Sequence, residues 1–372
     1  MKLNIRSLLT IRTQSQQLFD FVRDNQSPHF ILHLDRLDTV ADRVIAIMQR
    51  DYPDGKIPFH SRWRHFETDR VALLFTNLDP TEKLRSQLEL AIVSVLLDAG
   101  AGDRWRYCDR NGKIWSRSEG LAIASFEMVA QGLISGKATD LSRLMLADLA
   151  NGLQVRDDNP IVGLNGRWQL LVKLGDSMAA KSYGRLSDYF DGLFDRQTLS
   201  AAELLALVLD AFADIWVGRL GGLGDTWQHS ALKGNSYVPF HKLSQWLTYS
   251  LMEPFQAFGI EITDLDAMTG LAEYRNGGLF LDLGVLELRD RSVSTTLHSP
   301  ASELIVEWRS LTIILLDQVA VKIRSKLGVN AETLPLVKIL QGGTWTAGRE
   351  IAQECRTSGG PPLWVQSDGT VF

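Results

Sequence analysis

The stretch Ser200-Ala-Ala-Glu-Leu-Leu-Ala-Leu-Val-Leu209 indicates that the chain is built mainly from helices. Ser200 and Glu203 stand three positions apart before an apolar run, which is the capping-box pattern of a buried helix N-terminus. We expect this helix to continue to about Trp216. The glycines within 221–224 follow the helix instead of opening one, so they favour a helix stop over a phosphate-binding loop.

Helical spacing of apolar residues recurs along most of the chain. It predicts helices over 15–24, 34–50, 80–99, 118–134, 140–152, 167–178, 239–258, 301–327 and 335–341. Alternating residues and Asn-Gly or Asp-Gly turns predict β-hairpins over 105–115 and 363–372. No repeat or linker divides the sequence, so we expect a mainly α protein with one domain, 1–372, and a few short hairpins.

The composition limits the class of partner. The 372 residues carry a formal net charge of -5, so no general excess of cations is present to hold a nucleic acid polymer. The two cysteines lie far apart and no apolar run reaches 18 residues, from which we expect a cytoplasmic protein with no membrane span. A small anionic ligand is compatible with local arginine patches such as those at 62–65 and 104–106.

Common catalytic signatures are absent from the sequence. It contains no GxGxxG after a strand, no GxxxxGK[ST], no HExxH and no GxSxG. His65, His241 and His298 have no metal-ligand spacing. We therefore expect no cofactor and no catalytic metal.

The segment Val238–Ser250 has the highest density of chemically informative residues. Lys242, Trp246 and Tyr249 share one helical face, and the leucines at 243, 247 and 251 share another. Lys242 is then either a partly desolvated cation beside a tryptophan or an exposed lysine next to an aromatic core residue.

Glu273 follows a predicted short helix from about Asp264 and a glycine turn at Gly270. Such a hairpin can direct a carboxylate into a cleft, and the apolar continuation at 279–286 would bury the segment behind it. Burial raises the pKa of a carboxyl group unless a cation such as Lys242 opposes the shift. The alternative is an ordinary ion pair between Glu273 and Arg275 or another surface arginine.

The first third of the chain combines glycines, aromatic side chains and carboxylates. Leu97–Gly102 precedes Trp105 and Tyr107, and Arg117–Gly120 follows them. A planar polar ligand needs such stacking faces and directed acceptors. A hairpin with structural aromatic residues explains the pattern equally well.

Several segments together resemble a poorly characterised family linked to pyrimidine ring-opening catabolism of uracil in fungi and bacteria. The segments are 60–66, 98–102, 117–122, 239–250, 273–278, 303–309, 342–345 and 367–372, so the resemblance extends over nearly the whole chain. Members are often labelled uracil phosphoribosyltransferase. The acidic-pair loop that binds phosphoribosyl diphosphate is missing here, which argues against that label.

The order and spacing of the segments are also similar to the queuosine-nucleotide glycosidase family, itself similar to helix-hairpin-helix DNA glycosylases. That family has a lysine early in one helix and, about thirty residues later, a hairpin leading into an Asp-Tyr-Arg tripeptide with a catalytic aspartate. Here Lys242 precedes Glu273-Tyr-Arg275 by 31 positions. Glutamate in place of aspartate moves the carboxylate by one methylene, and positioning on that scale affects catalysis.

The resemblance implies a fold like that of helix-hairpin-helix glycosylases and a hydrolase acting on an N-glycosidic bond, with the catalytic hairpin at about 239–286. It implies that Glu273 stabilises the transition state while Lys242 keeps Glu273 ionised. Asp98 or Glu119 is then expected to read or protonate the leaving group. The full set of expected substrate-binding residues is Arg64, His65, Asp98, Trp105, Glu119, His241, Trp246, Arg275 and Arg349.

In a pathway that opens the uracil ring, the implied substrate is ribosylurea or its 5′-phosphate, which is hydrolysed to urea and ribose or ribose phosphate. Arg64, Arg275 or Arg349 is the expected partner of a phosphate group. Other enzymes of the pathway are the macromolecular partners that such a role allows. Two alternatives stay open: phosphoribosyl transfer to or from uracil, and a non-catalytic nucleotide-binding subunit.

Overall fold

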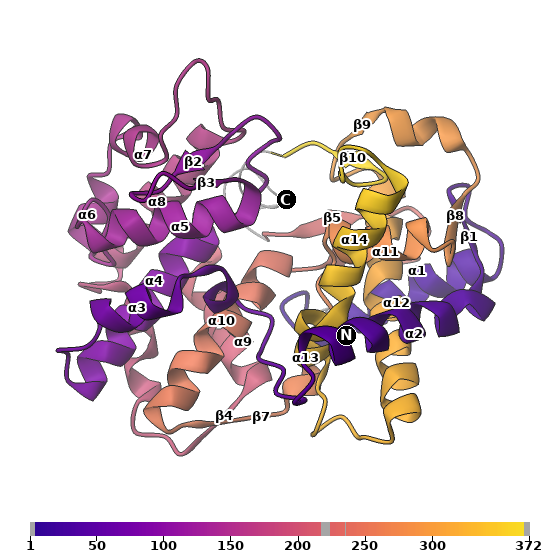
Figure 1. Cartoon of the computed structure of the whole chain (residues 1–372), viewed down its shortest axis with the longest axis horizontal. Helices are drawn as coiled ribbons and strands as arrows, with labels where there is room; N and C mark the ends of the chain where they lie inside the picture. Colours follow the sequence, from indigo (N-terminus) through magenta and orange to yellow (C-terminus); the bar gives the residue numbers. More distant parts are fainter. Residues whose placement is uncertain (1–3, 217–223, 235, 368–372) are drawn as a thin grey trace. The chain divides into compact units, whose positions relative to one another are not determined.

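The computed structural model describes residues 4–216, 224–234 and 236–367 (Figure 1). The chain forms two compact units, each assembled from separate stretches of sequence. The first unit comprises Met1–His60, Asp225–Gln245 and Asp264–Gln366. The second comprises Ser61–Gly224, Trp246–Thr263 and Ser367–Phe372.

The first unit is mainly helical. Its helices are α1 (Leu8–Arg23), α2 (Leu37–Asp51), the first turn of α10 (Lys242–Phe258), α11 (Tyr274–Asp282), α12 (Glu303–Leu327), α13 (Leu336–Ile339) and α14 (Trp345–Cys355). Short 3-10 helices are η1 (Leu34–Arg36), η5 (Leu265–Ala267) and η6 (Arg291–Thr295), and η7 (Leu340–Thr344) is a π-helical turn. Its strands are β1 (Phe30–Leu32), β5 (Thr226–Gln228), β6 (Tyr237–Pro239), β8 (Leu286–Leu288), β9 (Leu297–His298) and β10 (Trp364–Val365).

The strands of this unit form three two-stranded sheets. β1 pairs with β8 and β5 pairs with β6, both antiparallel, while β9 and β10 run parallel. The pairing of β5 with β6 places Thr226 opposite Pro239, which brings Asp225 close to the start of α10. This hairpin therefore prepares one side of the candidate site.

Helix α12 is the core of the first unit. Its residues from Leu304 to Leu316 are all buried, and they include Glu307 and Arg309 as well as apolar side chains. α1, α2 and α11 pack against α12, and α14 packs along α11 (Figure 1). The buried charges on α12 need partners within the protein, because an isolated charge in an apolar interior is costly.

Glycine permits the close packing of α14 against α11. A Cβ atom on Gly348 would lie 2.2 Å from the backbone oxygen of Arg275, well inside van der Waals contact. A side chain at this position would therefore push the two helices apart. The backbone of Arg275 is held in place by this contact.

The second unit is also mainly helical. Its helices are α3 (Thr68–Leu74), α4 (Pro80–Leu96), α5 (Arg117–Ala130), α6 (Ala138–Ser142), α7 (Leu146–Gly152), α8 (Leu164–Ala180), α9 (Ala201–Ala211) and the rest of α10. Its 3-10 helices are η2 (Arg62–His65), η3 (Leu186–Leu193) and η4 (Ala213–Ile215), and its strands are β2 (Tyr107–Cys108), β3 (Ile114–Trp115), β4 (Thr198–Ser200) and β7 (Glu261–Thr263). β2 and β3 are antiparallel, and β4 and β7 are parallel.

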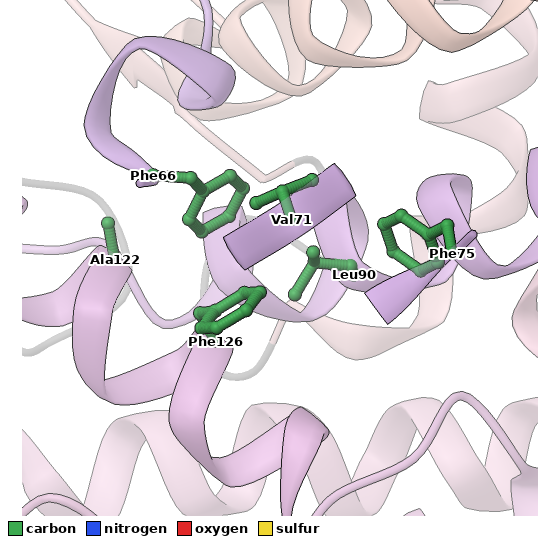
Figure 2. Close-up of a cluster of buried hydrophobic side chains, with 6 residues drawn as sticks. All are labelled: Phe66, Val71, Phe75, Leu90, Ala122 and Phe126. Carbon is green, nitrogen blue, oxygen red and sulfur yellow. The ribbon is translucent and has the colours of Figure 1, made fainter. Parts of the chain in front are cut away.

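One core of the second unit lies between α3, α4 and α5. Figure 2 shows its six buried side chains: Phe66, Val71, Phe75, Leu90, Ala122 and Phe126. Phe66 follows η2 directly, so burial of its ring also fixes the end of the segment that carries Arg62, Arg64 and His65. Each fully buried apolar side chain of this size stabilises the fold by roughly 1.5–3 kcal/mol.

The mainly helical class predicted from the sequence is confirmed, and so is the hairpin over 105–115. The helix predicted over 140–152 is interrupted, because α6 ends at Ser142 and α7 begins at Leu146. The backbone oxygen of Leu144, between them, accepts a hydrogen bond from the Trp168 indole at 2.7 Å. Most of the predicted stop at 221–224 lies outside the described residues.

One finer prediction, the capping box at Ser200 and Glu203, is wrong. The Ser200 side chain makes no capping hydrogen bond, and the Glu203 carboxylate instead pairs with Arg196. Ser200 belongs to β4, where it is paired with Thr263. In the described half of the hairpin predicted over 363–372, β10 pairs with β9. Residues 368–372 lie outside the described part.

No helix in the described residues is both long and apolar enough to span a bilayer.

Candidate active site

Lys242 is the first residue of α10, and a carboxylate holds this helix start in place. The backbone N–H of Lys242 donates to Oδ2 of Asp225 at 3.0 Å. The backbone oxygen of Asp225 accepts from the N–H groups of Phe240 and His241 at 2.9 and 3.3 Å. Asp225 therefore fixes the backbone on both sides of the turn into α10, as an acidic residue at a helix N-terminus can do.

Asp225 is buried and is paired with Arg309 of α12. Both guanidinium nitrogens Nη1 and Nη2 donate to the carboxylate at 2.7 Å, and the Trp227 indole donates to Oδ1 at 2.7 Å. Burial alone would raise the pKa of Asp225, but the charge and hydrogen bonds of Arg309 hold it far below its usual range. Asp225 is thus a fixed negative charge next to the start of α10.

Arg309 also contacts the segment that carries Glu273. Its Nε atom donates to the backbone oxygen of Ala272 at 3.1 Å, and its guanidinium lies 4.0 Å from the centre of the Phe240 ring. One arginine therefore ties the residue before Glu273 to the turn before Lys242. Gln245 makes a second tie, since its side chain bonds the backbone oxygen of Phe240 at 3.0 Å and the N–H and hydroxyl of Thr269.

Glu273 is the N-cap residue of α11 and its carboxylate is held by the helix start. Oε2 accepts from the N–H of Arg275 at 2.7 Å, and Oε1 accepts from the N–H of Asn276 at 2.6 Å. This is the usual way in which an acidic N-cap satisfies the first amides of a helix. The orientation of the carboxylate is therefore set by the backbone.

The pKa of Glu273 is raised because its surroundings remove water from the carboxyl group. Hydrogen bonds from the backbone N–H groups of Arg275 and Asn276 oppose this shift, and so do the positive charges of Lys242 and Arg275. Lys242 thus acts on Glu273 in the direction predicted from the sequence. Both side chains belong to the first unit and both are partly exposed.

Arg275 and Arg349 gather around Trp345 at the start of α14. The guanidinium of Arg275 lies 5.2 Å from the centres of the Tyr274 and Trp345 rings, and that of Arg349 lies 5.7 Å from the Trp345 ring. Trp345 and Arg349 are four residues apart on one helix, so they share a face. Two of the predicted phosphate-binding arginines are therefore brought together around Trp345, and one of them, Arg275, follows Glu273 by two positions.

A π-helical turn, η7, leads directly into Trp345. Gln341 in this turn lies between His60 Nδ1 and the Tyr52 hydroxyl, at 3.0 Å from each. The His60 ring centre is 6.3 Å from that of Trp345. π-Helical turns are rare and recur at functional sites.

His241, another predicted substrate-binding residue, is buried next to Lys242. Its Nε2 atom lies 2.9 Å from the backbone oxygen of Ile5, and burial lowers the pKa of the imidazole. His241 has a positive φ of 47°, an uncommon conformation for a residue with a side chain. Its ring thus holds the N-terminal segment against the turn into α10.

The second unit brings several other predicted residues together around the buried Arg62. Asp98 pairs with Arg62 at 3.2 Å and accepts from the Ser118 hydroxyl at 2.8 Å. The guanidinium of Arg62 lies 5.5 Å from the Trp246 ring centre, which is 6.0 Å from that of His65. Glu119 also acts electrostatically on Arg62, raising its pKa against the larger lowering caused by burial.

Arg64 and Trp105 make contacts of their own that do not involve Arg62. Arg64 pairs with Glu253 at 2.5 Å. Trp105 is fully buried, its indole donates to the backbone oxygen of Leu153 at 2.9 Å, and Gly120 packs against its ring. This is the packing of a structural aromatic residue, which was the alternative interpretation of this segment.

Asp225, Gln245 and Arg309 were not predicted from the sequence. Arg309 had a visible signal, because it interrupts the apolar run of a helix that must be buried. Its partner Asp225 follows the glycines at 221–224 and is 84 positions away, so no local pattern connects the two.

Lys242 and Glu273 do not line a groove that the first unit carries beside α11 and β8. That groove has a volume of about 640 Å³ and is lined by residues of 281–294 and 356–364 together with Arg36. Neither Lys242 nor Glu273 is among its lining residues. One of the arginines that line this groove, Arg356, already donates to both carboxylate oxygens of Asp282 at 2.6 Å.

The fold and the site define a mainly helical protein in which a lysine acts on a carboxylate fixed at a helix start. The chain belongs to the family described as "Protein of unknown function (DUF1688)", whose model matches residues 4–372. It is 38% identical to Protein urg3 of Schizosaccharomyces pombe over 98% of each chain. It is 35% identical to Uracil catabolism protein 4 of Lachancea kluyveri, over 99% of this chain and 98% of the relative.

Proposed function

We propose that this protein is a hydrolase that cleaves an N-glycosidic bond in uracil catabolism. The observation that carries the proposal is the Glu273 carboxylate, which two backbone N–H groups orient and whose pKa the charge of Lys242 lowers. A carboxylate held in this way costs little reorganisation when charge develops on a substrate next to it.

The chemistry follows from the bond that is broken. Cleavage of an N-ribosyl bond develops positive charge on the anomeric carbon and the ring oxygen, and a fixed carboxylate stabilises that charge. The oxygen of water becomes attached to the anomeric carbon, and a proton of the water replaces the sugar on the leaving nitrogen. Glu273 orients this water or accepts its proton.

The raised pKa of Glu273 suits either role. A general base is most effective when its pKa approaches the working pH, and loss of water around the carboxyl group moves Glu273 in that direction. Lys242 limits the shift, so that the carboxylate form remains accessible. The Glu273 carboxyl group is therefore more basic than usual, and Lys242 helps it to keep its negative charge.

The name of one relative and the pathway that the family resemblance implies support the substrate class. One relative is named for uracil catabolism. If the uracil ring of a nucleoside or nucleotide is opened and degraded, ribosylurea or its 5′-phosphate remains. Hydrolysis of that compound gives urea and ribose or ribose phosphate.

The similarity to queuosine-nucleotide glycosidases and helix-hairpin-helix glycosylases supports the same reaction class. In the sequence pattern, Glu273 corresponds to the aspartate of that family. Lys242 is the first residue of α10 and Glu273 is the N-cap residue of α11, which is compatible with the pattern of a lysine early in one helix and a carboxylate after the following hairpin.

A substrate panel tests the reaction class. The purified protein is incubated with ribosylurea, its 5′-phosphate, uridine and uridine monophosphate, without a diphosphate donor, and released urea, uracil and sugar are followed by mass spectrometry. Release of urea supports the hydrolase. Turnover of uracil compounds only when phosphoribosyl diphosphate or diphosphate is added would establish the transferase instead, and tight binding without turnover would establish a binding subunit.

A further inference from the structure

Arg275 differs from the other buried arginines of the described chain. Arg62, Arg167 and Arg309 each donate hydrogen bonds to protein oxygens, and all three are at most 2% exposed. Arg275 is only 6% exposed, yet its guanidinium has no hydrogen-bond or ion-pair acceptor among the described residues. The Arg275 nitrogens are not among the fully enclosed side-chain atoms that lack a partner, so they reach the surface, where their N–H donors are available to an anionic ligand.

The guanidinium of Arg275 is nonetheless held in place. It lies 5.2 Å from the ring centres of both Tyr274 and Trp345. Its own backbone is fixed on both sides, because its N–H donates to Glu273 and its backbone oxygen faces Gly348. Contact with aromatic rings engages the cation without using its N–H donors, so the fork of donors is available in a defined position.

A second cation lies on the same tryptophan. The guanidinium of Arg349 is 5.7 Å from the Trp345 ring centre, and its side chain is exposed. A buried and an exposed guanidinium therefore lie around one ring, and the buried one belongs to the residue two positions after Glu273. Guanidinium groups bind phosphate oxygens in pairs, with parallel N–H···O bonds.

We propose that Arg275, assisted by Arg349, binds the phosphate group of a phosphorylated ribosyl substrate. This inference rests on the proposed function of Glu273 and makes the substrate a sugar phosphate such as ribosylurea 5′-phosphate, in place of the free ribosyl compound. The inference also selects among the three arginines, Arg64, Arg275 and Arg349, that the sequence offered as partners of a phosphate group. Arg64 is engaged by Glu253 in the second unit, whereas Arg275 lies two residues from Glu273.

Binding of the product tests the subsite separately from catalysis. Isothermal titration calorimetry compares ribose 5-phosphate, ribose and inorganic phosphate on the wild-type protein and on Arg275→Gln. The matched control is Arg291→Gln, which removes an equal charge from a side chain that is 88% exposed. Arg275→Lys keeps the charge but loses the fork, and circular dichroism checks that each variant is folded.

We expect ribose 5-phosphate to bind at one site per chain and ribose to bind much more weakly. Arg275→Gln weakens binding of ribose 5-phosphate by about 10- to 100-fold, with a smaller loss in Arg275→Lys and none in Arg291→Gln. Equal affinity of the wild-type protein for ribose and ribose 5-phosphate would overturn the proposal without the use of any variant. Equal losses in Arg275→Gln and Arg291→Gln would show attraction by net charge only and would also overturn it.

The experiments can distinguish failure of the proposed phosphate subsite at Arg275 from failure of the proposed hydrolase reaction. Binding of ribose 5-phosphate through Arg275, with no hydrolysis of any ribosyl compound, would retain the subsite and remove the hydrolase. Equal kcat/KM for ribosylurea and its 5′-phosphate, without ribose 5-phosphate binding, would retain the hydrolase and remove the subsite.

Discussion

The guanidinium of Arg309 and the carboxylate of Asp225 form a buried bidentate pair, with both N···O distances at 2.7 Å. The pair joins the turn before Lys242 to the residue before Glu273, because Asp225 accepts from the N–H of Lys242 and Arg309 donates to the oxygen of Ala272. Asp225 and Arg309 therefore position Lys242 and Glu273 through backbone atoms, without a hydrogen bond to the charged group of either side chain.

Loss of Arg309 is expected to damage both stability and turnover. Arg309→Met leaves Asp225 buried without its cation, which lowers the free energy of unfolding by about 3–5 kcal/mol. Urea denaturation measures this loss, and Arg291→Met serves as the exposed control. Arg309→Lys keeps one charge but not both hydrogen bonds, so in the folded variant we expect kcat to fall more than KM rises. An unchanged kcat in a folded Arg309→Lys protein would show that the pair has no positioning role.

Removal of Lys242 is expected to move the pH dependence of activity. The charge of Lys242 lowers the pKa of Glu273, so Lys242→Met raises that pKa further. Activity that requires ionised Glu273 then appears only at higher pH, and the acid limb of the kcat/KM profile shifts upward. Lys233→Met removes a charge from an exposed side chain and is expected to leave the limb in place. A shift to lower pH in Lys242→Met would contradict the account.

Glu273 itself should make the fold less stable as the pH rises. Its pKa in the folded chain is above the ordinary value of 4.5, so between these two values the folded state binds more protons than the unfolded state. Stability attributable to this group is therefore lost as the pH increases through that window. Glu273→Gln removes the titration, so its melting temperature should improve relative to wild type from pH 4.5 upward. Parallel curves for the two proteins would rule out a raised pKa.

Gly348 offers a test of the packing that holds Arg275. Gly348→Ala places a methyl group where only 2.2 Å separates it from the backbone oxygen of Arg275, and overpacking of this kind costs roughly 1–3 kcal/mol. Gly192→Ala is the control, since an added Cβ there meets nothing within 4 Å. We expect lower stability and weaker ribose 5-phosphate binding in Gly348→Ala only, measured by thermal unfolding and calorimetry. Equal behaviour of the two variants would disprove this role of the glycine.

Local patterns in the sequence predicted the helices well because apolar periodicity reflects burial directly. The helix predicted over 239–258 is α10, which begins three residues later at Lys242. Glu273 heads a new segment as predicted, but the sequence patterns did not identify that segment as the helix α11. The capping box at Ser200 and Glu203 failed because a parallel pairing with Thr263 and an ion pair with Arg196 took those groups. Pairing with a strand far away in the sequence, which a local pattern does not contain, therefore determines the role of Ser200.

The candidate site was predictable only in part for the same reason. The influence of Lys242 on Glu273 could be anticipated from two segments 31 positions apart. The Asp225–Arg309 pair and the contacts of Arg275 with Trp345 join segments that no periodicity relates. The stacking of Trp105 could not be assigned from the sequence, because a buried and a ligand-facing indole leave the same pattern.

The central claim concerns the carboxylate of Glu273 and is tested most directly by urea release in a single turnover. Enzyme in excess over ribosylurea 5′-phosphate is mixed and quenched over time, with the wild-type protein, Glu273→Gln and Glu332→Gln compared. Glu332 is exposed in the same unit and controls for the loss of one carboxylate. We predict that Glu273→Gln releases urea at least about 100-fold more slowly while Glu332→Gln matches the wild type. Full urea release by a folded Glu273→Gln protein would contradict the assignment of Glu273.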